Sequence, residues 1–168
     1  MAFLNINGPI AADTVYSENV LVAKDVEFTL PEVAPVAVDV EAMGTMSVPL
    51  WARLDDMEVT VTKIGLDMGL GSMLTPTLKP IEFRFPQEVI DANGDTKIVP
   101  CKAFIKGMNK TVPGIGITPG ETSSNDLTYM VTRYQLFVDG KEMILVDRLA
   151  SIVRINGKDY TSGIQSML

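Results

Sequence analysis

Apolar and polar residues alternate with a period of two along most of this 168-residue chain, which is the pattern of β-strands that bury one face. Residues 20–30 and 58–64 are rich in β-branched residues and are expected to be strands. Between them, residues 34–43 alternate cleanly, and we expect a half-buried strand with an acidic outer face. Its two faces carry Val36, Val38 and Val40 on one side and Ala37, Asp39 and Glu41 on the other.

The last third of the chain contains the clearest hairpin signals. Residues 128–138 alternate, Asp139-Gly140 has the composition of a two-residue hairpin turn, and residues 141–147 form the returning strand. The expected faces of the first strand are Met130, Tyr134, Leu136 and Val138 on one side and Arg133 and Gln135 on the other. Residues 152–155 and the Asn156-Gly157 turn predict a second hairpin.

One short helix is expected at residues 66–74, where apolar residues fall at helical spacing. Gly69 and Gly71 oppose it, since each glycine costs about 1 kcal/mol relative to alanine in a helix. Further strands are expected at residues 81–85 and 97–108, on either side of a turn at 91–95.

Two segments rich in glycine and proline, residues 43–49 and 109–126, are expected to be loops. Together with the strands and the helix, they predict a mainly β fold, an antiparallel β-sandwich or barrel-like domain with one short flanking α-helix. The length fits a single domain spanning residues 1–168.

Composition limits the kinds of partner. Hydrophobic residues make up 46% of the chain and charged residues 21%, so some apolar surface is expected to face other protein chains. The formal charge of −7 argues against binding nucleic acid. Cys101 is the only cysteine, and the first residues resemble no signal peptide, so we expect folding in a cytoplasm without a membrane anchor.

The sequence offers little catalytic or metal-binding chemistry. It contains no histidine, which removes the commonest general base and metal ligand. Counting a calcium loop from Asp91 places Thr96 at the required glycine and Lys102 at the closing glutamate, so a hairpin turn is favoured instead. Asp55-Asp56 is interpreted as a solvated turn and Cys101 as a small core residue. We therefore expect no catalytic residue, no cofactor and no metal ion.

A set of motifs in order gives the chain a family resemblance. Tyr134-Gln-Leu-Phe-Val-Asp-Gly-Lys-Glu, then Val146-Asp147, then Ile155-Asn-Gly-Lys-Asp, resemble the FII-like family of phage major tail tube proteins. The segments at residues 22–31, 41–46 and 54–58 resemble the family's earlier blocks, whereas the first 19 residues have no clear counterpart.

The resemblance implies a β-sandwich or barrel-like subunit that assembles into hexameric rings, which stack into the tube of a contractile tail. Its expected partners are other copies of itself, the sheath, the baseplate and the tape-measure protein. Related tubes serve phages, phage-derived bacteriocins and type VI secretion, so the expected location is a virion tail or a tail-like particle made in a bacterial cytoplasm.

An acidic lumen follows from the same implication. A hexameric ring would carry six times −7, or −42 formal charges, and would let DNA pass without binding it. The candidate lumen residues are Asp39, Glu41 and Glu58, although they could equally face bulk solvent. Both expected loops are candidate contacts between subunits, although they could also be ordinary surface loops. The candidate contact residues are Met43, Gly44, Met46, Pro49, Pro113, Gly114, Gly116 and Gly120.

Two other classes of function stay open at this point. A carbohydrate-binding or adhesin module would need aromatic platforms, and Trp51 is the only tryptophan. An enzyme that uses two carboxylates, as glycosidases do, would need both groups to face one cleft about 5–10 Å apart.

Overall fold

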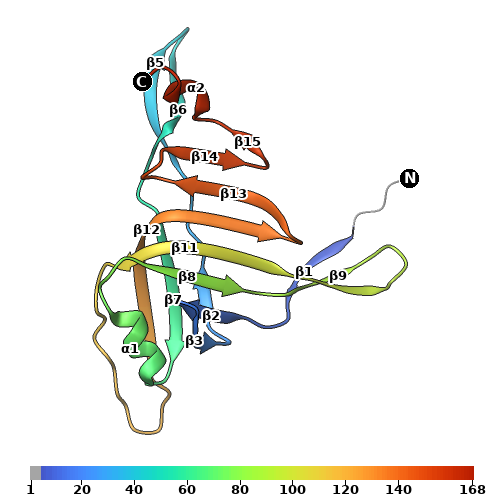
Figure 1. Ribbon diagram of the computed structural model, residues 1–168, viewed down its shortest axis with the longest axis vertical. Helices are drawn as coiled ribbons and strands as arrows, with labels where there is room; N and C mark the ends of the chain where they lie inside the picture. Colours follow the sequence, from blue (N-terminus) through green and yellow to red (C-terminus); the bar gives the residue numbers. More distant parts are fainter. Residues whose placement is uncertain (1–4) are drawn as a thin grey trace.

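The computed structural model describes residues 5–168 as antiparallel β-structure with two short helices (Figure 1). The strands and helices, in chain order, are β1 Ile6–Ile10, β2 Thr14–Ser17, β3 Val20–Lys24, β4 Glu27–Thr29, β5 Pro35–Glu41, β6 Thr45–Leu54, β7 Glu58–Ile64, α1 Met68–Leu74, β8 Lys79–Arg84, β9 Gln87–Ile90, β10 Thr96–Val99, β11 Cys101–Asn109, β12 Ser124–Val138, β13 Lys141–Asp147, β14 Ile152–Ile155, β15 Lys158–Asp159 and α2 Ser162–Gln165. The mainly β prediction is confirmed.

The largest sheet runs in the order β15-β14-β13-β12-β11-β8-β2-β3 and branches at β12. One edge of β12 pairs with β11, while its other edge pairs first with β7 and then with β13. β4 joins the outer edge of β7. This branching wraps β2, β3, β4, β7, β8 and β11 around a shared core and leaves β13–β15 as an extension of the sheet.

A β-bulge in β12 reverses the face that meets the core. Lys106 pairs with Arg133 and the next residue of β11 pairs with Val131, so Thr132 is left over. The buried positions therefore change from odd numbers, ending at Val131, to even numbers, beginning at Tyr134. The expectation that Met130 shares a face with Tyr134 is wrong for this reason.

The core lies inside the wrapped strands and is closed by α1, which packs against β3. Leu70 and Met73 of the helix are buried; Gly69 precedes Leu70 and Gly71 follows it. The predicted helix is confirmed and begins at Met68, after an N-cap at Asp67. Within residues 5–168, neither helix has the length and apolar character needed to cross a membrane.

Two structures project from this body (Figure 1). One is a three-stranded sheet in the order β1-β9-β10, and the other is the β5–β6 hairpin, which pairs with no other strand among the described residues and is called the arm below. Residues 34–43 are therefore not half-buried, because Val38 and Val40 are exposed on the arm. Residues 43–49 are not a loop either: beyond a tight turn they belong to β6.

Backbone restrictions shift other boundaries. Residues 20–30 form two strands rather than one, since Asp25 has a φ of 52° between them. Pro100 divides residues 97–108 into β10 and β11. The turn at 91–95 joins β9 to β10, and the side chain of Asp91 accepts hydrogen bonds from the backbone N–H groups of Asn93 and Asp95. The loop expected at residues 109–126 is present but shorter, since β11 extends to Asn109 and β12 begins at Ser124; both C-terminal hairpins are confirmed.

Candidate assembly interface

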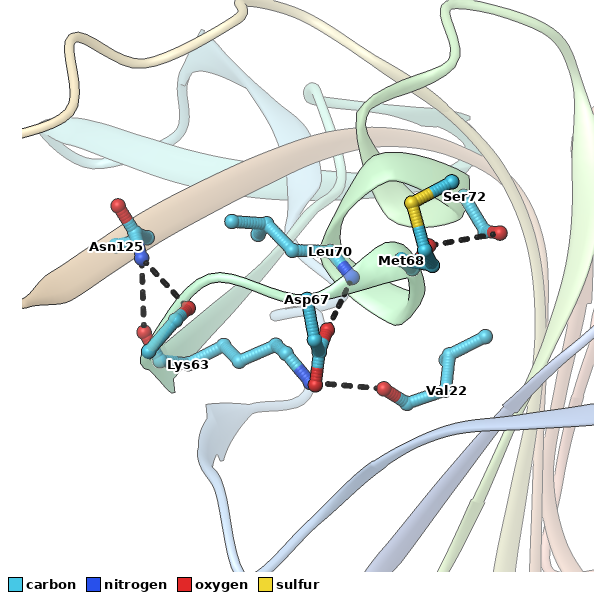
Figure 2. Close-up of polar contacts among 8 residues, drawn as sticks. Val22, Lys63, Asp67, Met68, Leu70, Ser72 and Asn125 are labelled. Carbon is cyan, nitrogen blue, oxygen red and sulfur yellow. Dashed lines mark hydrogen bonds and ion pairs between the residues drawn. The ribbon is translucent and has the colours of Figure 1, made fainter.

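Helix α1 is fixed at its N-terminus by a buried lysine (Figure 2). The Nζ of Lys63 donates to the carbonyl oxygen of Val22 at 2.8 Å and to Oδ2 of Asp67 at 3.1 Å. The other carboxylate oxygen of Asp67 accepts from the N–H of Leu70 at 2.8 Å. The N–H of Leu70, and secondarily Lys63, holds the pKa of Asp67 below its usual value.

A second buried lysine closes the other end of the helix. The Nζ of Lys79, which is 2% exposed, donates to the carbonyl oxygens of Ser72, Met73 and Thr75 at 2.7, 3.1 and 2.9 Å. Burial lowers the pKa of this amine, while the carbonyl acceptors replace its lost hydration. The hydroxyl of Tyr129 also donates to Met73, and burial raises its pKa. These buried groups serve the helix rather than a site.

The arm has one apolar face and one polar face. Cross-strand pairs on the apolar face are Val36 with Leu50, Val38 with Val48, and Val40 with Met46. Val38 and Val40 are each 44% exposed and Met46 is 51% exposed. Because a two-stranded sheet cannot bury its own face, this surface is open to another protein.

Two of the three candidate lumen residues lie together on the polar face of the arm. Asp39 pairs with Ser47, and Glu41 pairs with Thr45, whose hydroxyl donates to Oε1 of Glu41 at 2.9 Å. Pro49 lies on the same face, where β6 tolerates a residue without an N–H because, among the strands of residues 5–168, it pairs only with β5. The turn follows Glu41 directly, with φ values of 54° at Met43 and 121° at Gly44, and the tip side chain of Met43 is fully exposed.

Glu58, the third candidate lumen residue, lies elsewhere. It begins β7 and forms an ion pair with Lys110, which also contacts Oδ2 of Asp56 at 2.9 Å. Donating hydrogen bonds to Glu58 first and to Asp56 second raises the pKa of Lys110, and the hydrogen bond that Asp56 accepts from Lys110 lowers the pKa of Asp56. Glu58 is thus partly neutralised and does not share the acidic face of the arm.

The base of the arm is held by a distant arginine. Arg148 donates from its guanidinium to the carbonyl oxygens of Leu54 at 3.1 Å and Asp55 at 2.8 Å. On the same side, the rings of Trp51 and Tyr160 lie 6.2 Å apart between centroids. These contacts connect the arm to the C-terminal segment, whose residue Thr161 lines the same groove as Val36 and Ala52 of the arm; the arm and this segment are seen at one end of the molecule in Figure 1.

The remaining candidate contact residues lie in the loop at residues 110–123. Its members Pro113, Gly114, Gly116 and Gly120 lie at the opposite end of the long axis from the arm (Figure 1). The loop exposes Val112, Ile115 and Ile117, and its internal contacts include the Ser123 hydroxyl donating to the carbonyl oxygen of Gly116. The two candidate contact regions are therefore separate surfaces.

A groove of about 710 Å³, not expected from the sequence, lies beside the open edge of β4. Phe28 lies on its wall, with ring centroids 4.6 Å from Phe83 and 5.6 Å from Phe85. The lining residues are Ile10, Asp13, Val26, Glu27, Phe28, Thr29, Leu30, Thr60, Thr62 and Phe85. The only signal in the sequence is that Leu30 and Phe85 each precede a proline, which often ends a strand.

The residues of the C-terminal motifs form turns between strands. Asp139-Gly140 and Asn156-Gly157 all have positive φ, from 51° to 80°, as two-residue hairpin turns require. Oδ1 of Asp159 accepts hydrogen bonds from the N–H groups of Thr161 and Ser162, and Oδ1 of Asp147 accepts from those of Leu149 and Ala150. The motif residues set the path of the chain.

An exposed arm, an open sheet edge and an apolar groove are the features of a structural subunit that assembles with other protein chains. The sequence matches the family of the phage tail tube protein FII over residues 10–168, and this chain belongs to that family. Tail tube proteins are structural, so the chain is not an enzyme. Within residues 5–168, no three His, Cys, Asp or Glu side chains are grouped in a way that could hold a metal ion.

Solved structures of tail-like particles share the fold. A chain of the PVC sheath-tube complex, an extracellular contractile injection system in its extended state, superimposes with a TM-score of 0.55 at 9% identity, covering 77% of this chain and 90% of that one. A chain of the PVC sheath/tube terminator gives a TM-score of 0.51 at 9% identity, covering 77% and 95%. No curated protein matches the sequence.

Proposed function

We propose that this tail tube protein forms the inner tube of a contractile phage-type tail, as stacked hexameric rings with one 168-residue domain per copy. The observation that carries the proposal is the β5–β6 arm, which projects from the body with an exposed apolar face. Such a face is a liability for a monomer and an advantage for a subunit that polymerises. The loop at residues 110–123, at the other end, forms a second contact between copies.

The lumen of this tube is acidic and passes DNA or another polyanion without binding it. Asp39 and Glu41 supply the charge, because they share one exposed face of the arm. Glu58 contributes less, since Lys110 partly neutralises it. Tubes carrying Asp39→Lys and Glu41→Lys are expected to retain DNA fragments that pass through wild-type tubes. If variant and wild-type tubes retain DNA equally, these two residues do not line the lumen.

The sheath surrounds this tube, while the baseplate nucleates it and the tape-measure protein lies inside. Assembly takes place in a bacterial cytoplasm, and the product is a phage tail or a headless particle. A tube that delivers protein cargo in a related injection system is the second candidate, favoured by the fold shared with chains of an extracellular contractile injection system.

Negative-stain electron microscopy of the purified protein over a concentration series tests the proposal, with isolated baseplates supplied at each concentration. Rings or hollow tubes are expected, either spontaneously or as extensions of the baseplate. A protein that stays monomeric at every concentration and fails to extend a baseplate would contradict the proposal.

A further inference from the structure

We infer that the apolar face of the arm of one copy docks in the groove beside β4 of a neighbouring copy. The inference rests on the proposed function, since it names the surface that receives the arm when the tube forms. Both surfaces belong to the same chain and neither is covered within the described structure.

The groove matches the arm in polarity. Its walls carry the apolar side chains of Ile10, Phe28 and Phe85, and the exposed edge of β4 forms one side. The side chains offered by the arm are Val38, Val40 and Met46, all of them substantially exposed. Docking would remove both sets of apolar side chains from water, which is the main favourable contribution to association.

Charge selects which face of the arm enters. The groove carries two carboxyl groups, Asp13 and Glu27, and the polar face of the arm carries two more, Asp39 and Glu41. Docking through the polar face would bring like charges together, whereas the apolar face brings none. Repulsion between the carboxylates therefore opposes docking through the polar face and favours docking through the apolar face.

Two other grooves fit the arm less well. One lies at the base of the arm itself, lined by Leu54 and Arg148, and the arm of the same chain already borders it. The other, of about 300 Å³, also has apolar walls, at Ile81 and Phe104, but it is less than half as large and its lining carries Lys106 and Arg133. The groove beside β4 is larger, and its lining contains no lysine or arginine.

The contact would propagate because arm and groove are different surfaces of one chain. Such a head-to-tail contact leaves a free arm at one end and a free groove at the other, so every added copy can accept the next. A contact between identical surfaces would stop at two copies. The distinction gives the inference a direct test.

A cysteine pair tests it in assembled tubes. Val40→Cys places a thiol on the apolar face of the arm, and Thr60→Cys places one in the groove. Cys101 is 2% exposed and burial raises the pKa of its thiol, so it is not expected to react. Mild oxidation is expected to give a ladder of disulfide-linked oligomers on a non-reducing gel.

Ser47→Cys with Thr60→Cys is the matched control, because Ser47 lies on the polar face of the same hairpin. This pair is expected to give no ladder. Cross-linking that stops at dimers, fails altogether, or is equally efficient in the control would overturn the inference.

Charge insertion provides a second measurement. Val40→Asp is expected to raise the protein concentration needed for assembly by about tenfold or more, because it buries a carboxylate in the groove, whereas Ser47→Asp is expected to have a much smaller effect. If wild-type protein forms tubes and Val40→Asp assembles equally well, the docking is wrong and the tube function stands. If wild-type protein extends no baseplate, both are wrong.

Discussion

Gly69 of α1 lies directly against the carbonyl oxygen of Val22 in β3: a methyl group on its Cα would lie 2.3 Å from that oxygen. The same carbonyl accepts a hydrogen bond from Lys63, so it cannot move away without breaking that bond. The glycine lowers helix propensity but allows the helix to pack closely on the core.

Gly69→Ala is therefore expected to destabilise the fold by about 1–3 kcal/mol, although alanine favours a helix. Gly71→Ala is the matched control, since its added methyl group meets nothing within 4 Å. The control is expected to stabilise the protein by about 0.4–1 kcal/mol. Urea unfolding of both variants measures the difference, and equal effects would show that close packing at Gly69 is unimportant.

Lys79→Met is expected to lower the free energy of unfolding by about 2–4 kcal/mol, because three carbonyl oxygens at the end of α1 lose their donor. Lys97→Met on the exposed strand β10 removes the same charge without such contacts. Its expected effect is within about 0.5 kcal/mol. Thermal and urea unfolding report both values, and a mild effect at Lys79 would argue against its role at the helix end.

Acid is expected to weaken the N-terminus of α1 through Asp67. The folded-state pKa of this carboxyl lies below its unfolded value of about 3.9, so its contribution to stability is complete above that pH and is lost as the pH falls through the folded pKa. Asp67→Asn keeps a capping oxygen but has no titrating group. The unfolding free energy of this variant should change less than that of the wild-type protein when the pH is lowered from about 5 to about 2, the range in which carboxylates become protonated.

The other carboxyl groups with lowered pKa values, Asp56 and Asp159, are present in both proteins and cancel in this comparison. Unfolding curves of the two proteins that stay parallel down to the lowest pH would contradict the assignment to Asp67.

Arg148→Gln is expected to loosen the arm while leaving the core intact. The substitution removes the donors to Leu54 and Asp55, so trypsin should cleave after Arg53, the residue just before them, several times faster. Arg154→Gln breaks a partly exposed ion pair with Glu142, away from the base of the arm, and serves as the control. Unchanged cleavage at Arg53 in Arg148→Gln would mean that the arm is held by other contacts.

Strands in which the alternation of apolar and polar residues matches the buried and exposed faces could be predicted from the sequence. In β7, Val59 and Val61 are buried as the period of two requires, and its ends match the prediction. The Asp139-Gly140 turn was equally predictable, because its positive φ values need those residue types.

The arm could not be predicted because Val38 and Val40 give the same pattern whether their face meets the core of their own chain or another protein. Pro49 suggested a loop, yet β6 accommodates it because β5 is its one partner among the described strands. The groove depends on Phe28 and Phe85, which are distant in the sequence and meet only in the folded chain. Sequence periodicity records the polarity of a face and not the identity of its partner.

End-on electron cryomicroscopy of particles grown from the purified protein, on baseplates where needed, tests the central claim most directly. The account expects hollow rings with six-fold symmetry that stack into a continuous tube. Compact monomers that never extend a baseplate, or filaments without a central channel, would contradict the account of this chain as a tube-forming subunit.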